Sequence, residues 1–220
     1  MSKRRPVVVV LAAGRGMRFR GPGHKLMQQL GPNADMTADL TADTMLSRTL
    51  RHALETGLRV VVVTSAALAP AVRKLVASQD LVEMPEFDGR GRPSQVGMGH
   101  SIAAGVSATG DADGWLIVPA DMPLMRPASM RAVADAIDHF PVAYAQYRGR
   151  RGHPVGFSAE LYSELVDLHG DDGARRLLAR YPSQPVDVDD PGVLVDIDTE
   201  DDLARLLKAA EPSDSPSDQR

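Results

Sequence analysis

Two kinds of hydrophobic pattern alternate along the chain. Short runs of consecutive apolar residues, such as Pro6–Ala12 and Arg59–Thr64, are typical of strands that are buried on both faces of a parallel sheet. Between them lie stretches with apolar residues three or four positions apart, such as Met45–Thr56, which are typical of helices with one buried face. The pattern therefore predicts strands that alternate with helices.

The predicted strands are Pro6–Ala12, Arg59–Thr64, Leu81–Met84, Gly114–Pro119, Pro141–Tyr147, Val155–Phe157, Val186–Val188 and Val193–Asp196. The predicted helices are Met45–Thr56, Pro70–Ser78, Ser101–Ser107, Ala128–His139, Ala159–Leu168, Gly173–Tyr181 and Glu200–Ala210. This alternation predicts an α/β fold with a doubly wound, mostly parallel sheet and right-handed crossovers. We expect a single domain over residues 1–210 with a polar insertion or mobile loop at Gly31–Thr44. The Pro-, Ser- and Asp-rich segment Glu211–Arg220 is expected to be a disordered tail.

Composition excludes several classes of function. The chain has no cysteine, which excludes disulfides, thiolate metal sites and a cysteine nucleophile. Its first apolar run ends at Gly14, and no apolar stretch of roughly 18 residues follows, so we expect a cytoplasmic protein with neither a signal peptide nor a membrane span. The net charge is −4 and the basic residues form no long stripe, which argues against nucleic acid as a partner.

A glycine-rich loop, Leu11–Phe19, follows the first predicted strand. Gly14 and Gly16 permit positive φ and let backbone N–H groups approach a ligand closely. The loop and the turn after it add three cations, Arg15, Arg18 and Lys25. Backbone donors and cations at the end of a strand predict a cradle for a triphosphate, although the spacing is neither that of a Walker A loop nor that of a dinucleotide fingerprint. The alternative is a tight surface turn with solvated arginines.

Carboxylates follow two other predicted strands. Asp121 ends the run Val118-Pro119-Ala120, where desolvation is costly unless the carboxylate meets a cation; its structural alternative is to cap the turn before a helix. Asp196 and Asp198 are alternate residues of a segment predicted to be extended, so their side chains point the same way. Three hard carboxylates at the carboxyl edge of the sheet predict a Mg²⁺ site that also uses substrate phosphates.

The segment at Asp198 has a second interpretation, which does not exclude the first. Asp198 or Thr199 has the residue type of a helix N-cap, and the acidic residues from Glu200 onward favour the N-terminus of a helix.

The loop Leu-Ala-Ala-Gly-Arg-Gly-Met-Arg-Phe…Lys resembles the signature of nucleotidyltransferases that activate sugars and cofactors. Arg18 and Lys25 fall on the arginine and the lysine of that signature, with a slightly longer spacing to the lysine. Asp121 matches the Mg²⁺ ligand that the family places in an Asp-x-Pro segment. The segment Asp196–Asp202 resembles the family's Asp-(Ile/Leu)-Asp-Thr-Pro-Glu-Asp, with Glu200 where proline is usual.

Three further segments resemble molybdenum cofactor cytidylyltransferases. These are Gly97–Gly105, Gly152–Phe157 (Gly-His-Pro-Val-Gly-Phe) and Leu168–Arg175 (Leu-His-Gly-Asp-Asp-Gly-Ala-Arg). The asparagine that is usual upstream of the first is not evident in Asp88–Gln95. The resemblance implies a Rossmann-like nucleotidyltransferase fold in which His153 faces the pterin substrate and Ser101 lies near the nucleotide.

The resemblance also implies a reaction and a set of roles. CMP from CTP would be transferred to the terminal phosphate of the molybdopterin form of the molybdenum cofactor, with Mg²⁺ as cofactor and a molybdoenzyme as a partner that receives the product. Arg18, Lys25 and Asp121 would be catalytic. The nucleotide would bind to Leu11, Ala12, Ala13, Gly14, Arg15, Gly16, Lys25 and Ser101, and the metal to Asp121, Asp196 and Asp198.

Three alternatives stay open. The nearest is a molybdopterin guanylyltransferase that uses GTP, and the second is a sugar-phosphate or other small-alcohol nucleotidyltransferase. The third is a non-catalytic accessory protein that binds the cofactor; the presence of Lys25, Asp121 and the paired aspartates counts against it.

Overall fold

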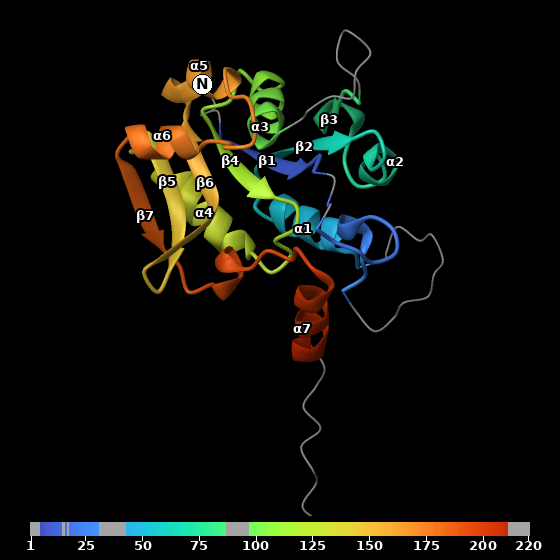
Figure 1. Cartoon of the computed structure of the whole chain (residues 1–220). Helices are drawn as coiled ribbons and strands as arrows, with labels where there is room; N and C mark the ends of the chain where they lie inside the picture. The colour runs from blue at the N-terminus through green and yellow to red at the C-terminus, as the bar shows by residue number, and fades with distance from the viewer. Residues whose placement is uncertain (1–4, 15, 17, 31–42, 87–96, 211–220) are drawn as a thin grey trace, which may run out of the picture.

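The computed structural model describes residues 5–14, 16, 18–30, 43–86 and 97–210, and a seven-stranded sheet forms its centre (Figure 1). The strand order is β3-β2-β1-β4-β6-β5-β7. The strands are β1 (Val7–Ala12), β2 (Arg59–Ser65), β3 (Leu81–Met84), β4 (Gly114–Pro119), β5 (Val142–Tyr147), β6 (Arg150–Ser158) and β7 (Ser183–Asp187). Only β6 runs antiparallel to its neighbours β4 and β5. The predicted doubly wound, mostly parallel sheet is thereby confirmed.

Helices cover both faces of this sheet (Figure 1). The α-helices are α1 (Met45–Leu54), α2 (Ala69–Val72), α3 (Met98–Ser107), α4 (Pro127–Ala136), α5 (Tyr162–Val166), α6 (Arg175–Arg180) and α7 (Glu200–Ala210). Short 3₁₀ helices are η1 (Lys25–Met27), η2 (Ser78–Asp80), η3 (Ala159–Leu161) and η4 (Pro191–Leu194). Helices α1 and α4 pack against each other on one face, and α3 packs with α5 on the other.

The valine run of β1 explains why the sheet needs helices on both sides. Val8 and Val10 belong to the apolar cluster on the α1 and α4 face, whereas Val7 and Val9 belong to the cluster on the α3 face. Because successive side chains of a strand point to opposite faces, a continuous apolar run has to be covered twice. Gly105 allows α3 to pack closely against this face of the sheet, since a Cβ at position 105 would lie 2.4 Å from Cγ1 of Val9.

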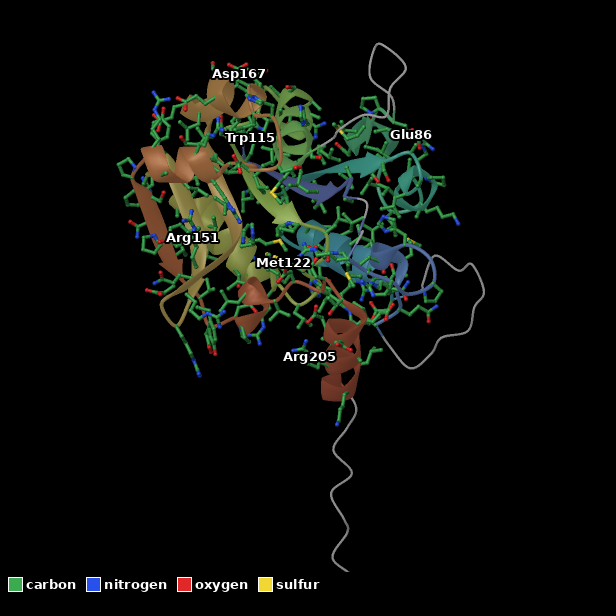
Figure 2. The ribbon with its side chains drawn as sticks, in the orientation of Figure 1. Glu86, Trp115, Met122, Arg151, Asp167 and Arg205 are labelled. Atoms are coloured by element: carbon green, nitrogen blue, oxygen red, sulfur yellow. The ribbon has the colours of Figure 1, made fainter. Side chains whose placement is uncertain are left out.

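The single tryptophan is part of the α3 face. Trp115 of β4 is buried beneath α3 and α5 (Figure 2). Its indole nitrogen donates to Oγ1 of Thr109 at 3.0 Å, and its ring contacts the ring of Tyr162. The polar atom of this large core residue is therefore satisfied.

The pairing of β1 with β4 brings two predicted site segments together. These parallel strands are in register with Leu11 opposite Pro119, and the amide of Ala120 donates to the carbonyl of Leu11 at 3.1 Å. The glycine loop after β1 and Asp121 after β4 therefore leave the sheet at the same edge. This edge is a topological switch point of the sheet, because β2 and β4 lie on opposite sides of β1, and open α/β sheets bind ligands at such points.

The predicted strand Val193–Asp196 is wrong. The chain forms the 3₁₀ helix η4 instead, with Pro191 in its first turn and the Asp190 carboxylate accepting from the Gly192 amide at 2.9 Å. Gly192 packs against the chain after β4, where a Cβ would lie 2.2 Å from the carbonyl oxygen of Leu124. Proline, the Asp190 cap and this close approach favour a tight turn over an extended strand.

The predicted strand Val155–Phe157 is too short, because its strand begins earlier in the chain. The turn before it contains only Arg148 and Gly149, both at positive φ (48° and 75°), and β6 starts at Arg150. Two residues at positive φ form the type of hairpin turn that fits the twist of neighbouring strands. The predicted helix Pro70–Ser78 is also shorter: α2 ends at Val72 and the chain continues in tight turns with hydrogen bonds between residues three apart.

Of the remaining predicted elements, Leu81–Met84, Gly114–Pro119 and Glu200–Ala210 have the predicted bounds, and the others are present with shifted ends. Of the predicted insertion Gly31–Thr44, only its last two residues are described; the Asp43 carbonyl accepts from the amide of Leu30, and Thr44 bridges to Gln29. The predicted tail, Glu211–Arg220, lies outside the described residues. Among the described residues, no helix is long and apolar enough to cross a membrane.

Candidate active site

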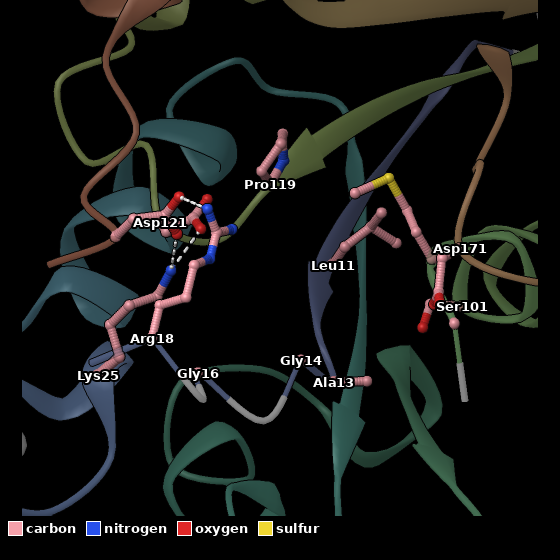
Figure 3. Close-up of a pocket in the computed structure, with 13 residues that line it drawn as sticks. Leu11, Ala13, Gly14, Gly16, Arg18, Lys25, Ser101, Pro119, Asp121 and Asp171 are labelled. Carbon is pink, nitrogen blue, oxygen red and sulfur yellow. Dashed lines mark hydrogen bonds and ion pairs between the residues drawn. The ribbon is translucent and has the colours of Figure 1, made fainter. Parts of the chain in front are cut away.

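A cavity of about 330 Å³ lies at the carboxyl ends of β1 and β4 (Figure 3). Its walls include nine of the predicted site residues: Leu11, Ala13, Gly14, Gly16, Arg18, Lys25, Ser101, Asp121 and Asp198. Four further residues, Gly97, Met98, Pro119 and Asp171, complete the lining. Two predicted nucleotide-binding residues are not among them: Ala12 is buried in the core, and Arg15 lies outside the described residues.

Lys25 joins two of the predicted metal ligands at one end of this cavity. Its ammonium nitrogen lies 2.7 Å from Oδ2 of Asp121 and 2.9 Å from Oδ1 of Asp198 (Figure 3). The guanidinium of Arg18 lies 2.7 Å from Oδ2 of Asp198. Burial opposes the charge of Lys25, but the two carboxylates outweigh it and the pKa of Lys25 is raised. The lysine is therefore held as a cation between two anions.

His24 positions Lys25. It is the N-cap of η1, and its Nδ1 accepts from the amide of Leu26 at 3.2 Å. The backbone of Gly14 lies close enough to this imidazole to favour its charged form, which places the glycine loop beside η1. Burial lowers the pKa of His24, and the nearby charge of Lys25 adds to that shift. No sequence pattern singles out this histidine, because its two partners are set by the path of the loop.

Two hydrogen bonds to backbone carbonyls hold the main chain at Asp121. Its carbonyl oxygen accepts from the amide of Ile197 at 3.0 Å. The carbonyl of the preceding residue, Ala120, accepts from the buried hydroxyl of Thr49 in α1, also at 3.0 Å. These bonds fix the main chain on both sides of Asp121, so that its carboxylate is directed at the cavity.

Thr199, and not Asp198, caps the last helix. The Asp202 carboxylate accepts from the amide and the hydroxyl of Thr199, and the amide of Asp202 donates to Oγ1 of Thr199 at 3.2 Å. This reciprocal arrangement satisfies the first turn of α7. Because capping is done by Thr199, the carboxylate of Asp198 stays available to Lys25 and Arg18.

Asp196 differs from the other two aspartates. The residues between η4 and α7 form no strand, and Asp196 does not line the cavity. Burial raises the pKa of Asp196, and the neighbouring charges of Asp198 and Asp121 raise it further. Within the described part of the chain, no group of three or more His, Asp or Glu side chains is placed to hold a metal ion. Asp121 and Asp198 converge on Lys25. Asp196 lies next to Asp198, and its role as a metal ligand stays a prediction.

His153 lies beside the cavity and not in its lining. It sits in an irregular part of β6, between the pairs Tyr144–Val155 and Gln146–Arg151, where the register shifts. Its Nδ1 is buried and has no hydrogen-bond partner among the described residues. Burial lowers the pKa of His153, while the charge of Asp121 acts in the opposite direction. A buried nitrogen without a partner is uncommon in folded proteins, which makes His153 a candidate for a functional role.

The loop after α5 packs onto the N-terminus of α3 and supplies Asp171. The amide of Gly99 donates to the carbonyl of Gly170 at 2.9 Å. A Cβ at Gly97 would lie 2.3 Å from that carbonyl oxygen, and one at Gly173 would lie 2.8 Å from the sulfur of Met98. The glycines of two separate sequence motifs therefore form one contact. Their spacing identified both motifs, but the position of Asp171 on the cavity wall was not predicted.

Residues 8–186 match a protein family described as the MobA-like NTP transferase domain. Over 122 residues the chain is 33% identical to the purine catabolism protein PucB of Bacillus subtilis strain 168, a match that covers 53% of this chain and 58% of that protein. The crystal structure of Rv0371c from Mycobacterium tuberculosis H37Rv is similar, with a TM-score of 0.72, 26% identity and coverage of 93% of this chain and 98% of that one. Rv0371c in complex with manganese gives a TM-score of 0.69 at 26% identity, covering 93% and 99%.

Proposed function

The chain belongs to the MobA-like NTP transferase family and is a nucleotidyltransferase, and we propose that it transfers CMP from CTP to the terminal phosphate of the molybdopterin form of the molybdenum cofactor. The observation that carries the proposal is the cluster of Lys25, Asp121 and Asp198 beside a glycine loop at the end of β1. The choice of acceptor and base is supported by the segments Gly152–Phe157 and Leu168–Arg175, which resemble cytidylyltransferases of that cofactor.

The triphosphate binds at the charged end of the cavity. Gly14 and Gly16 leave the backbone accessible there, and Gly16 adopts a φ of 59° that favours glycine. Lys25 and Arg18 supply the cations. In the absence of nucleotide both are neutralised by aspartates, and phosphate oxygens replace those partners when the nucleotide binds.

The donor set fits a divalent cation. Asp121 and Asp198 present carboxylate oxygens to one ammonium group, and their side chains are 23% and 17% exposed toward the cavity. Two hard carboxylates together with phosphate oxygens suit Mg²⁺, and the similar protein Rv0371c has been crystallised with manganese. When bound, such an ion would neutralise negative charge on the nucleotide phosphates. Asp196 would act through Asp198, which it neighbours.

The reaction is an in-line displacement. A phosphate oxygen of the acceptor attacks the α-phosphorus of CTP and forms a new P–O bond. The bond between the α-phosphorus and the oxygen that bridges it to the β-phosphate breaks, and pyrophosphate leaves with that electron pair. The acceptor phosphate is already a nucleophile, so no general base is needed. Lys25 and Arg18 stabilise the charge on the leaving pyrophosphate, which is the principal task in phosphoryl chemistry of this kind.

The acceptor approaches over β6. Because β6 runs antiparallel to β4 with Val155 opposite Ile117, it enters the sheet at the edge where β4 ends. His153, whose buried Nδ1 has no partner among the described residues, lies on this part of β6. Arg151, whose guanidinium lies 4.5 Å from the ring centroid of Tyr144, and the other arginines of the turn give this edge a positive charge that suits an anionic acceptor.

One assay tests the proposal. Pyrophosphate release is measured with each of the four ribonucleoside triphosphates, with and without molybdopterin cofactor, for the natural protein, for Asp121→Asn and for the control Asp172→Asn. We expect release with CTP and acceptor only, lost by at least about a hundredfold in Asp121→Asn. Release with GTP alone would identify a guanylyltransferase, and release with none of the four triphosphates would end the proposal.

A further inference from the structure

We propose that Asp171 reads an amino group on the base of the bound nucleotide and thereby favours cytosine over uracil. The inference rests on the proposed function, because it uses the triphosphate position given above. With the phosphates at Lys25 and Gly14, the base extends toward the other end of the cavity. Figure 3 shows that opposite wall, with Asp171 and Ser101 across the cavity from Lys25 and Asp121.

The position of Asp171 is built into the fold. It stands between Gly170 (φ 71°) and the segment ending in Gly173 (φ 55°), two backbone conformations that favour glycine. The loop is bonded to α3 through the amide of Gly99 and the carbonyl of Gly170. The carboxylate itself rests against Gly97, where a Cβ would lie 2.5 Å from Oδ1 of Asp171. A side chain at position 97 would displace this carboxylate.

The carboxylate of Asp171 has no hydrogen-bond or ion-pair partner among the residues that the structure describes. Its neighbour Asp172, which does not line the cavity, is paired with Arg176 at 3.6 Å. An ionised carboxylate only accepts hydrogen bonds. Cytosine presents an amino group at position 4, whereas uracil presents a carbonyl oxygen there, which a carboxylate repels. Asp171 thus favours the amino-bearing pyrimidine.

A purely structural role for Asp171 makes a different prediction. Its charge lies at the N-terminus of α3, where a negative side chain stabilises the helix dipole. If that were its whole role, substitution would lower the melting temperature and weaken all triphosphates by the same factor. A role in recognition changes the ratio between bases.

The test is a binding titration of CTP and UTP with Mg²⁺ in the absence of acceptor, on the natural protein, on Asp171→Asn and on the matched control Asp172→Asn. The Asn amide can donate to the uracil carbonyl, so we expect the preference for CTP over UTP to fall by about tenfold or more in Asp171→Asn and to be unchanged in Asp172→Asn. Melting curves of both variants verify the fold.

An unchanged CTP-to-UTP ratio in Asp171→Asn, or equal weakening of both nucleotides, overturns the inference. Failure of the proposed donor is seen separately, in the natural protein: if it binds GTP and not CTP, the donor is wrong, and Asp171 is tested with GTP against ITP, which lacks the 2-amino group. An equal effect of Asp171→Asn on that pair overturns the inference as well.

Discussion

The amide of Ile197 donates a hydrogen bond of 3.0 Å to the carbonyl oxygen of Asp121. This bond joins the turn after β4 to the segment that carries Asp198, and Ile197 itself is buried in the core. The two aspartates that hold Lys25 are therefore parts of one rigid unit, which Thr49 extends to helix α1.

Thr49→Val is expected to weaken that unit. The substitution keeps the shape of the side chain but leaves the buried carbonyl of Ala120 without its hydroxyl donor, which costs about 1–3 kcal/mol of unfolding free energy. We expect a lower melting temperature together with reduced kcat, because Asp121 directly follows Ala120. Thr49→Ser retains the hydroxyl and is the control. A stability loss in Thr49→Val no larger than in Thr49→Ser would contradict a role for the hydroxyl.

Lys25→Met should separate metal binding from nucleotide binding. Removing the ammonium leaves Asp121 and Asp198 facing each other without the cation that bridges them. We expect the affinity for Mn²⁺ in the absence of nucleotide to rise by at least about tenfold, since a competing positive charge is gone, while nucleotidyl transfer is lost. Binding is followed by electron paramagnetic resonance of free Mn²⁺. Lys74 is exposed, and Lys74→Met is the control. Equal Mn²⁺ affinity in the two variants would contradict the idea that the Lys25 ammonium and the metal ion compete for the same carboxylates.

Stability should depend on pH through two histidines. The pKa values of His24 and His153 are both lowered from 6.5, chiefly by burial, so the unfolded chain binds protons at a pH at which the folded one does not. The stabilisation is complete above about pH 6.5 and is lost as the pH falls toward the lowered pKa values. Denaturant titrations between pH 7.5 and 5 should show a smaller pH slope for His24→Asn, which can still cap Leu26. An unchanged pH slope in that variant would show that His24 does not contribute to the pH dependence of stability.

Asp190→Ala is expected to be among the more destabilising substitutions away from the cavity. Its carboxylate is 2% exposed and accepts from the Arg126 amide at 2.8 Å, from Oγ of Ser129 at 2.7 Å and from the Gly192 amide. Loss of this buried acceptor leaves three donors unpaired, a cost of about 2–4 kcal/mol in chemical denaturation. Asp189→Ala changes an exposed neighbour and should cost under about 0.5 kcal/mol.

The sequence alone determined seven of the eight predicted strands and most helices, and it singled out the candidate site residues on the loops. The run in β1 was predictable because a strand covered on both faces needs consecutive apolar residues. Gly14, Lys25, Asp121 and Asp198 were identifiable because each follows a strand or a turn with a recognisable residue pattern. The local errors arose where turn-forming residues outweighed the hydrophobic pattern. At η4 these are Pro191 and the Asp190 cap, and before β6 they are Arg148 and Gly149 at positive φ.

Only the tertiary structure decided how those residues meet. Lys25 lies 96 residues from Asp121 and 173 from Asp198, so no local pattern could reveal that one ammonium holds both carboxylates. Capping by Thr199 left Asp198 available, whereas Asp196 lies outside the cavity lining. Asp171 reached the opposite wall because glycines from two distant segments allow the backbones of α3 and its neighbouring loop to touch. Residue types set the chemistry available, and the packing of distant backbones selected which groups share the cavity.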